Sequence, residues 1–186
     1  MYRKYIKRIL DIFFAVVGLL ILSPLLLVAA FAIKNDSWGT VLIRQKRFTR
    51  SKMQFTVFKL RTMYDFTPEN PNDMLPDLNI YLTKVGKLLR KCSLDEAVQL
   101  LNVIGGSMSI IGPRPALFSQ EDLIAERDKH GANDVKPGMI GWVGIRGRVG
   151  LSIEEKAKLD GEYAQNATFI MDCKCLFGAI KNALGY

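Results

Sequence analysis

The chain has 186 residues, of which 49% are hydrophobic, and a formal net charge of +8 at neutral pH. This length allows one domain with a modest core, and the positive charge predicts an anionic partner: nucleic acid, acidic lipid or a phosphorylated substrate. The three cysteines and the single histidine, His130, exclude a disulfide framework, a zinc cluster and a His-based catalytic triad.

The first predicted element is an apolar segment. Residues 12–33 carry no charge, and a straight helix of this length would span about 33 Å, enough to cross a bilayer. Basic residues flank both ends, so the distribution of positive charge selects no orientation. Ser23 and Pro24 interrupt the segment, and the proline removes a backbone hydrogen bond. The segment therefore fits a spanning helix or a re-entrant helix–break–helix, with the Ser23 hydroxyl satisfying freed backbone groups. A buried core helix or a cleaved signal peptide fits less well.

A β-hairpin is predicted next, with strands at residues 41–43 and 55–58 around a polar turn at 49–52. Lys59 and Arg61 follow the second strand directly. They fit either a basic hairpin beside anionic lipid or a pair of cations that binds a diphosphate. Residues 65–80 contain three prolines and predict a loop, and helical spacing returns at residues 81–90, which end at Arg90.

The central stretch, RKCSLDEAVQLLNVIGGSMSIIGPRP at residues 90–115, contains two adjacent acids, Asp95 and Glu96. Ser93 and Glu96 match a capping box, so the acids can be explained as the start of a helix that ends at a Gly-Gly C-cap. The same pattern recurs at residues 152–155. The functional alternative is that the helix N-terminus keeps Asp95 ionised, so that it acts as a nucleophile toward phosphorus or shares a divalent cation with a phosphate.

The C-terminal half predicts further helices at residues 118–130, 152–165 and 168–184, the last with an apolar side suited to core or membrane-surface packing. Between the first two lies a glycine-rich, extended stretch that ends in Arg148. Gln99 and Asn102 fall on the polar side of the central helix and are expected to be exposed.

The central block closely resembles the signature of the bacterial sugar transferases that are monotopic phosphoglycosyl transferases. Four further stretches resemble that family in the same order: the KRILD start with its apolar run, FKLRTM, KPGMIGWVGIRGR and LDGEY. The resemblance implies a mainly helical α/β fold. A re-entrant membrane helix (residues 1–36) precedes a compact catalytic domain (37–186) with a small β-hairpin and interfacial amphipathic helices. It places the protein at the cytoplasmic face of the bacterial inner membrane, against anionic lipid.

The resemblance also implies a reaction: transfer of a phospho-sugar from a UDP-sugar to a polyprenyl phosphate, such as undecaprenyl phosphate, with release of UMP. By position Asp95 is the nucleophile and a ligand of Mg²⁺, and Glu96 positions the metal or assists the acceptor. Asp160 either assists the metal or acceptor or is an ordinary surface acid. The residues expected to bind phosphate are Lys59, Arg61, Arg90, Arg114 and Arg148.

This chain departs from the family pattern at Thr49, where glycine is usual, at Ala97-Val98 in place of Leu-Pro, and at Gly144 and Arg146 in place of Gln and Asn. These departures keep open the alternative that the protein is a catalytically inactive membrane-surface scaffold of the same fold. A nucleic-acid binder is disfavoured because no nucleic-acid module is present. The sequence also leaves open whether the transfer occurs in one direct step. It does not identify the sugar, the polyprenol or the pathway, and it does not fix the oligomeric state, which could be a homodimer.

Overall fold

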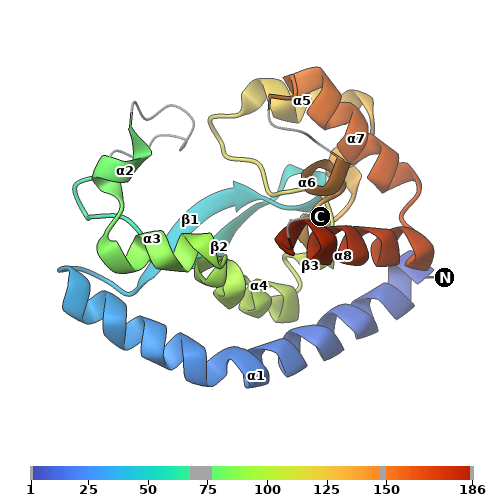
Figure 1. Cartoon of the computed structure of the whole chain (residues 1–186). Coiled ribbons are helices and arrows are strands. Elements are labelled where there is room, and N and C mark those ends of the chain that lie inside the picture. Colours follow the sequence, from blue (N-terminus) through green and yellow to red (C-terminus); the bar gives the residue numbers. More distant parts are fainter. Residues whose placement is uncertain (1, 68–76, 147–149, 185–186) are drawn as a thin grey trace.

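The structure is a computed structural model that describes residues 2–67, 77–146 and 150–184 (Figure 1). Its N-terminal part contains η1 (Tyr2–Ile6), α1 (Lys7–Asp36), β1 (Leu42–Phe48), η2 (Arg50–Lys52), β2 (Gln54–Leu60), α2 (Leu78–Tyr81) and α3 (Lys84–Lys91). Its C-terminal part contains η4 (Leu94–Gln99), α4 (Leu100–Gly105), β3 (Ser109–Ile111), α5 (Glu121–Lys129), η5 (Ala132–Asp134), β4 (Gly138–Ile140), α6 (Trp142–Arg146), α7 (Ile153–Gln165) and α8 (Phe169–Ala183). The protein is mainly helical with two small two-stranded sheets, as expected.

α1 is one continuous helix that bends near its middle, and both of its ends rise toward the side where the other elements lie (Figure 1). Pro24 lies inside the helix and cannot donate to the carbonyl of Leu20. The Ser23 hydroxyl donates to that carbonyl instead, at 2.9 Å. The predicted use of Ser23 is confirmed, and the expected break is a bend in an unbroken helix.

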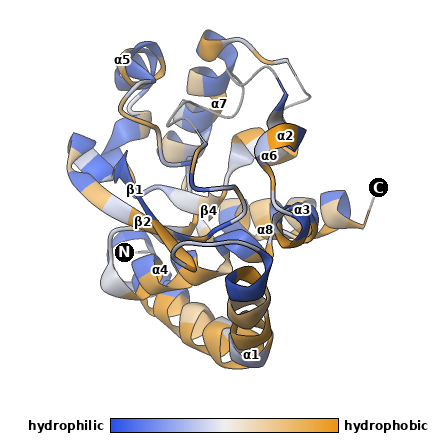
Figure 2. Cartoon of the chain, turned by 90° about the vertical axis from the view of Figure 1, so that its left-hand side faces the viewer, coloured by the Kyte–Doolittle hydropathy of each residue, from blue (hydrophilic) through white to orange (hydrophobic). Residues whose placement is uncertain are grey.

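One stripe of α1 packs against the rest of the protein along its whole length. Asp11, Ala15, Ala29 and Ile33 are buried, and the partly buried Leu19, Leu22 and Leu26 between them complete the three- to four-residue spacing of a single helix face. The other faces of α1 are exposed and apolar, and Figure 2 shows this helix as a hydrophobic edge of the molecule. Within the described residues, the helix from Tyr2 to Asp36 is the one element long and apolar enough to cross a membrane.

The hairpin of β1 and β2 is longer than predicted because the charged residues of β1 also join the antiparallel ladder, from Leu42↔Leu60 to Phe48↔Gln54. The departure at Thr49 does not disturb the turn. Thr49 has an ordinary φ of −102°, and its hydroxyl donates to the Ser107 carbonyl at 2.6 Å. Asn102 covers the free edge of β2: its amide side chain accepts from Phe58 N and donates to Thr56 O. It is buried for this reason, and the expectation that it is exposed is wrong.

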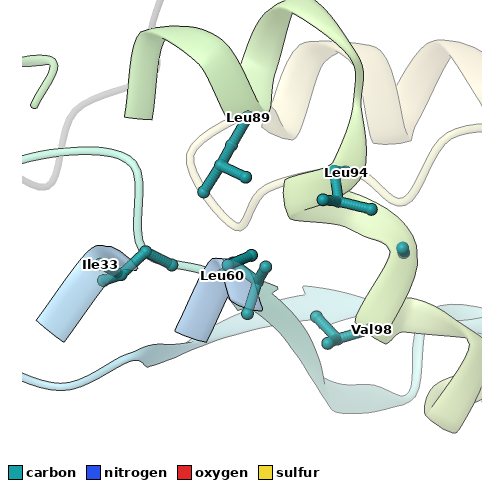
Figure 3. Packing of buried hydrophobic residues seen from close by; sticks show 7 residues of the cluster. Ile33, Leu60, Leu89, Leu94 and Val98 are labelled. Carbon is teal, nitrogen blue, oxygen red and sulfur yellow. The ribbon is translucent and has the colours of Figure 1, made fainter. Parts of the chain in front are cut away.

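A hydrophobic cluster joins α1 to the segment that carries the two acids. Ile33 of α1, Leu60 of β2 and Leu89 of α3 meet Leu94 and Val98 of η4 (Figure 3). Burial of a side chain of this size contributes about 1.5–3 kcal/mol. Because Leu94 and Val98 flank the acids in sequence, the cluster fixes where Asp95 and Glu96 lie.

The C-terminal half packs around a second cluster that includes Ile111, Trp142 and Tyr163. The stretch expected to be extended is only partly so: Gly138–Ile140 is β4, which pairs in parallel with β3, but Trp142–Arg146 is the short helix α6. A Cβ atom on Gly138 would lie 2.1 Å from the backbone nitrogen of Gly112, so only glycine permits this close approach.

Asp172 of α8 joins the two termini. It accepts from the Tyr2 hydroxyl at 2.5 Å and from Lys7 Nζ at 2.6 Å. Its other oxygen lies 2.7 Å from the Tyr163 hydroxyl. Asp11 of α1 accepts from the backbone N–H of Ile110 at 3.0 Å. These contacts attach the first half of α1 to the C-terminal half of the protein.

Candidate active site

The segment that holds the two acids is a 3₁₀ helix whose start differs from the prediction. Ser93 adopts a left-handed conformation with φ 55° and its side chain makes no capping hydrogen bond. Its backbone N–H donates to the Arg90 carbonyl at 3.1 Å and its carbonyl accepts from Glu96 N at 3.3 Å, so Ser93 joins the end of α3 to the first turn of η4. The predicted capping box is therefore absent, although Asp95 and Glu96 do lie in the first turn of a helix, and the Glu96 side chain makes other contacts.

Glu96 is held by two cations from distant parts of the chain. Lys59 Nζ lies 2.8 Å from Glu96 Oε1, and Arg114 Nη2 lies 2.5 Å from the same oxygen. Burial alone would raise the pKa of Glu96, but the charges of Arg114 and Lys59 outweigh burial and lower it to about 2. Glu96 is thus a permanently ionised anchor that positions one lysine and one arginine.

Asp95 has the opposite environment. It is 7% exposed, and among the described residues no ion pair engages it. Burial raises the pKa of Asp95, and the adjacent Glu96 charge raises it further, while Lys59 and Arg90 oppose the rise. Two neighbouring carboxyl groups whose pKa values are pushed apart are typical of sites that give each carboxyl group a separate role. Here Glu96 is committed to cations and Asp95 is available for chemistry.

Two further cations stand near the pair. Arg90 is oriented by a hydrogen bond from its Nε to the Thr62 hydroxyl at 3.0 Å, and its charge acts on Asp95. Arg47 donates to the Gln45 side chain at 2.7 Å and to the Pro115 carbonyl at 3.1 Å. Burial, together with the charge of Arg114, lowers the pKa of Arg47 to about 10.

A small hollow lies beside these cations. Its lining includes Arg47, Lys59, Gln99, Arg114, Gly138 and Met139. The prediction missed Arg47 and Gln99 as residues of this site, and expected Gln99 to be exposed, whereas it is 3% exposed. A signal for Arg47 was present in the sequence: once the hairpin register is known, strand alternation puts Gln45, Arg47 and Lys59 on one face of the sheet.

Two predicted phosphate-binding residues are placed elsewhere or not described. The guanidinium group of Arg61, which is 2% exposed, donates to the carbonyl groups of Ser37 and Trp38 after α1. It therefore fixes the end of α1 and is not brought to Glu96, because β2 ends at Leu60 and the chain turns away. Arg148 lies outside the described residues.

Asp160 lies in a buried ion pair and is not the surface acid that was one alternative. Its Oδ2 accepts from Arg127 Nη2 at 2.5 Å and from Arg127 Nε at 2.8 Å. Arg127 Nη1 then donates to the backbone carbonyl of Arg114 at 3.1 Å. Asp160 is thereby connected to the candidate site through Arg127, and its own carboxylate is committed to that pair.

The donor set is compatible with Mg²⁺. Among the described residues there is no group of three side chains that could enclose a metal ion, and Asp95 and Glu96 are the two neighbouring carboxylates of the site. Mg²⁺ in phosphate-handling sites is commonly held by one or two carboxylates together with substrate phosphates and water. Asp95, which pairs with no cation in the described part of the chain, fits this role.

A model of the family described as bacterial sugar transferase matches residues 2–185. The chain belongs to this family and is a transferase. It is 36% identical to the uncharacterized sugar transferase EpsL of Bacillus subtilis over 96% of this chain and 87% of that protein. It is also similar to larger enzymes. The UDP-glucose:undecaprenyl-phosphate glucose-1-phosphate transferase of Caulobacter vibrioides is 34% identical over 96% of this chain and 69% of that protein.

A third relative acts on a different sugar. The UDP-N-acetylgalactosamine-undecaprenyl-phosphate N-acetylgalactosaminephosphotransferase of Aeromonas hydrophila is 31% identical over 97% of this chain but only 44% of its own length. The chain therefore corresponds to one part of that larger protein.

Proposed function

We propose that this protein transfers a phospho-sugar from a UDP-sugar to a polyprenyl phosphate, such as undecaprenyl phosphate, and releases UMP, as the first membrane step of glycoconjugate synthesis. The observation that carries the proposal is the asymmetry of the acid pair: Glu96 is bound by Lys59 and Arg114, while Asp95 is buried and makes no ion pair with any residue that the structure describes. Relatives whose names state a UDP-sugar and undecaprenyl phosphate support the choice of substrates.

The proposed reaction has two displacements. The Asp95 carboxylate attacks the β-phosphorus of the UDP-sugar; an oxygen–phosphorus bond forms on Asp95, the bond to the bridging oxygen breaks, and UMP leaves. An oxygen of the polyprenyl phosphate then attacks the same phosphorus, which yields polyprenyl-diphosphate-sugar and restores the Asp95 carboxylate. A covalent carboxylate intermediate divides one difficult transfer into two easier steps.

The surrounding side chains supply charge and orientation. Arg114 and Lys59 are pre-positioned by Glu96, and the hollow that they line with Arg47 accommodates phosphate oxygens. Fixed cations in a partly water-excluded site stabilise the charge that develops in the transition state. Mg²⁺, held by Asp95 and the diphosphate oxygens, would supply further charge neutralisation.

The fold also supports a re-entrant membrane position at the cytoplasmic face of the inner membrane. A helix that spans the bilayer leaves its cytoplasmic domain at one end, so only that end can pack against it. In α1, buried residues occur from Asp11 to Ile33, on both sides of the bend. We infer that both ends of α1 emerge on the same side. The exposed apolar residues of the bend enter the lipid.

This arrangement is tested with single cysteines at Tyr5 and Trp38, which are 57% and 94% exposed, in a chain whose native cysteines are replaced. In sealed inverted vesicles an impermeant maleimide should label both positions. Labelling of Trp38 alone, with Tyr5 reached only after the vesicles are opened, would establish a spanning helix.

The enzymatic proposal is tested by UMP release from a panel of UDP-sugars, including UDP-glucose and UDP-N-acetylgalactosamine, with undecaprenyl phosphate and Mg²⁺. Wild type should release UMP with at least one donor. A sugar-labelled donor given without acceptor should leave label on the denatured protein. UMP release without trapped label would favour one-step transfer, and no release from any donor would favour the scaffold.

A further inference from the structure

Three basic side chains outside the Asp95–Glu96 cluster converge where α4 ends. Arg8 of α1 donates through its two terminal nitrogens to the carbonyl groups of Val103 and Ile104, at 2.5 and 2.7 Å. The next residue but one, Gly106, is the C-cap with φ 87°. A Cβ atom on Gly106 would lie 3.3 Å from Arg8 Nη2 and 3.8 Å from Lys136 Nζ. Two positive groups thus border one small space beside a residue with no side chain.

The hairpin turn brings a third cation to this place. The Thr49 hydroxyl is bonded to the Ser107 carbonyl, which fixes the turn, and therefore Arg50, next to the end of α4. Burial lowers the pKa of Lys136, and the charges of Arg8 and Arg50 lower it further. Among the described residues Asp11 is the acid whose charge counteracts them, and it already accepts from the backbone of Ile110. The cluster therefore carries an excess of positive charge that an anion would balance.

The position of the cluster on α1 indicates which anion it takes. Ile9 and Phe13, on the same stretch of helix as Arg8, are 66% and 58% exposed. A phosphate bound between Arg8 and Lys136 can therefore carry acyl chains that lie along this apolar surface. A free phosphate ion, which has no acyl chains, would gain no binding affinity from Ile9 and Phe13.

We propose that Arg8, Arg50 and Lys136 form a binding site for the headgroup phosphate of an anionic phospholipid. The site holds the N-terminal arm of α1 and the hairpin turn together at the membrane surface. It does not depend on sugar transfer, and it is measured without any activity assay.

The test is native mass spectrometry of the full-length protein in detergent micelles. Phosphatidylglycerol and phosphatidylcholine of identical acyl chains are added in equal amounts. Wild type should retain phosphatidylglycerol in preference to phosphatidylcholine. Lys136→Gln should reduce this preference about fivefold, in line with the contribution of one basic residue near an anionic surface. Arg50→Gln should reduce it less, and Lys136→Arg should restore it. Lys158→Gln, at an exposed lysine of α7, is the matched control and should have no effect.

Three results would overturn the proposal. The first is a wild-type protein that retains the two lipids equally. The second is an equal reduction of the preference by Lys136→Gln and Lys158→Gln, because net charge alone would then account for retention. The third is loss of the preference on addition of millimolar inorganic phosphate, which would make free phosphate the occupant. Thermal unfolding of each variant, compared with wild type, separates loss of the site from loss of the fold.

Discussion

Residues 93–96 and 152–155 have the same sequence pattern, a serine followed three residues later by glutamate, with a second acid just before that glutamate. At 152–155 the pattern forms a capping box: Glu155 N donates to the Ser152 hydroxyl at 3.1 Å, and Ser152 N donates to the Glu155 carboxylate at 2.8 Å. At 93–96 neither bond forms, and Glu96 pairs with Lys59 and Arg114.

The difference lies in what surrounds each segment. Residues 152–155 are exposed, so the serine and glutamate find partners only in each other. Ser93 instead lies between α3 and η4, and Leu94 and Val98, which follow it, are buried in a hydrophobic cluster. Two cations from the hairpin and from the Arg114 loop then reach Glu96. An identical local pattern is structural at one place and forms a candidate active site at the other.

The largest expected difference between the two segments is in the rate of UMP release, after substitution of the acid that precedes each glutamate. Asp95→Asn should lower UMP release by at least about a thousandfold, because an amide cannot act as the nucleophile. Glu154→Gln, the equivalent change in the other segment, should leave the rate within about twofold of wild type. Rates are measured under saturating donor and acceptor. Similar rates for Asp95→Asn and wild type would remove Asp95 from catalysis.

Substitution of the two glutamates should separate the two segments by their effect on activity. Glu96→Gln should lower kcat/KM about 10- to 100-fold, the usual cost of losing a group that orients the residues in contact with substrate. Glu155→Gln should lower the unfolding temperature slightly and leave kcat/KM unchanged. An active Glu96→Gln variant would show that Lys59 and Arg114 do not need this anchor.

The stability of the protein at low pH should depend on the ion pairs of Glu96. The fold lowers the pKa of Glu96 from 4.5 to about 2. The stabilising contribution of the Glu96 carboxylate is therefore present above pH 4.5 and is lost as the pH falls toward 2. The lost contribution is up to about 3 kcal/mol by proton linkage. Unfolding of wild type and Glu96→Gln, followed by circular dichroism from pH 6 to pH 2, should therefore converge in acid. Parallel curves would contradict the lowered pKa.

The pH dependence of activity should report the other acid. The pKa of Asp95 is raised above its ordinary value, so kcat/KM should decline on the acid side at a pH above 3.8, where the nucleophile becomes protonated. Removal of the neighbouring charge in Glu96→Gln should move this decline to lower pH. A decline that stays at the same pH in the variant would mean that the two carboxyl groups do not interact.

The smallest expected difference is in the free energy of unfolding, after substitution of the serine in each segment. Ser152→Ala removes an N-cap hydrogen bond and should lower the free energy of unfolding by about 1 kcal/mol. Ser93→Ala removes no capping bond and should change it by less than about 0.3 kcal/mol. Chemical denaturation of both variants provides the measurement. An equal loss at the two positions would indicate that Ser93 caps a helix in solution.

Local sequence patterns were sufficient to predict the elements that depend on contacts within a few residues along the chain. The bend at Pro24, the turn after β1, the glycine C-cap of α4 and the capped helix α7 all depend on contacts across three to five residues, and each occurs where it was predicted. The short helix α6 was missed because its Gly-rich sequence has little helical preference. It forms where Trp142 packs into the second hydrophobic cluster.

Distant contacts explain the residues whose surroundings were not foreseen. Arg61 and Lys59 are two positions apart and have the same kind of charge, yet Arg61 meets carbonyl groups after α1 and Lys59 meets Glu96. Asn102 and Gln99 are polar on a helix, but the neighbouring hairpin covers them. Asp160 has its partner 33 residues earlier, in Arg127.

The sequence by itself determined the apolar segment with its proline, the order of the helices, the family and the two acids on which the proposed chemistry depends. The tertiary structure decided which acid is bound by cations. The ion pairs that distinguish Glu96 from Asp95 join residues 37 and 18 positions apart. No local pattern specifies such pairs, because they form only when the hydrophobic clusters bring the hairpin, the 3₁₀ helix and the Arg114 loop together.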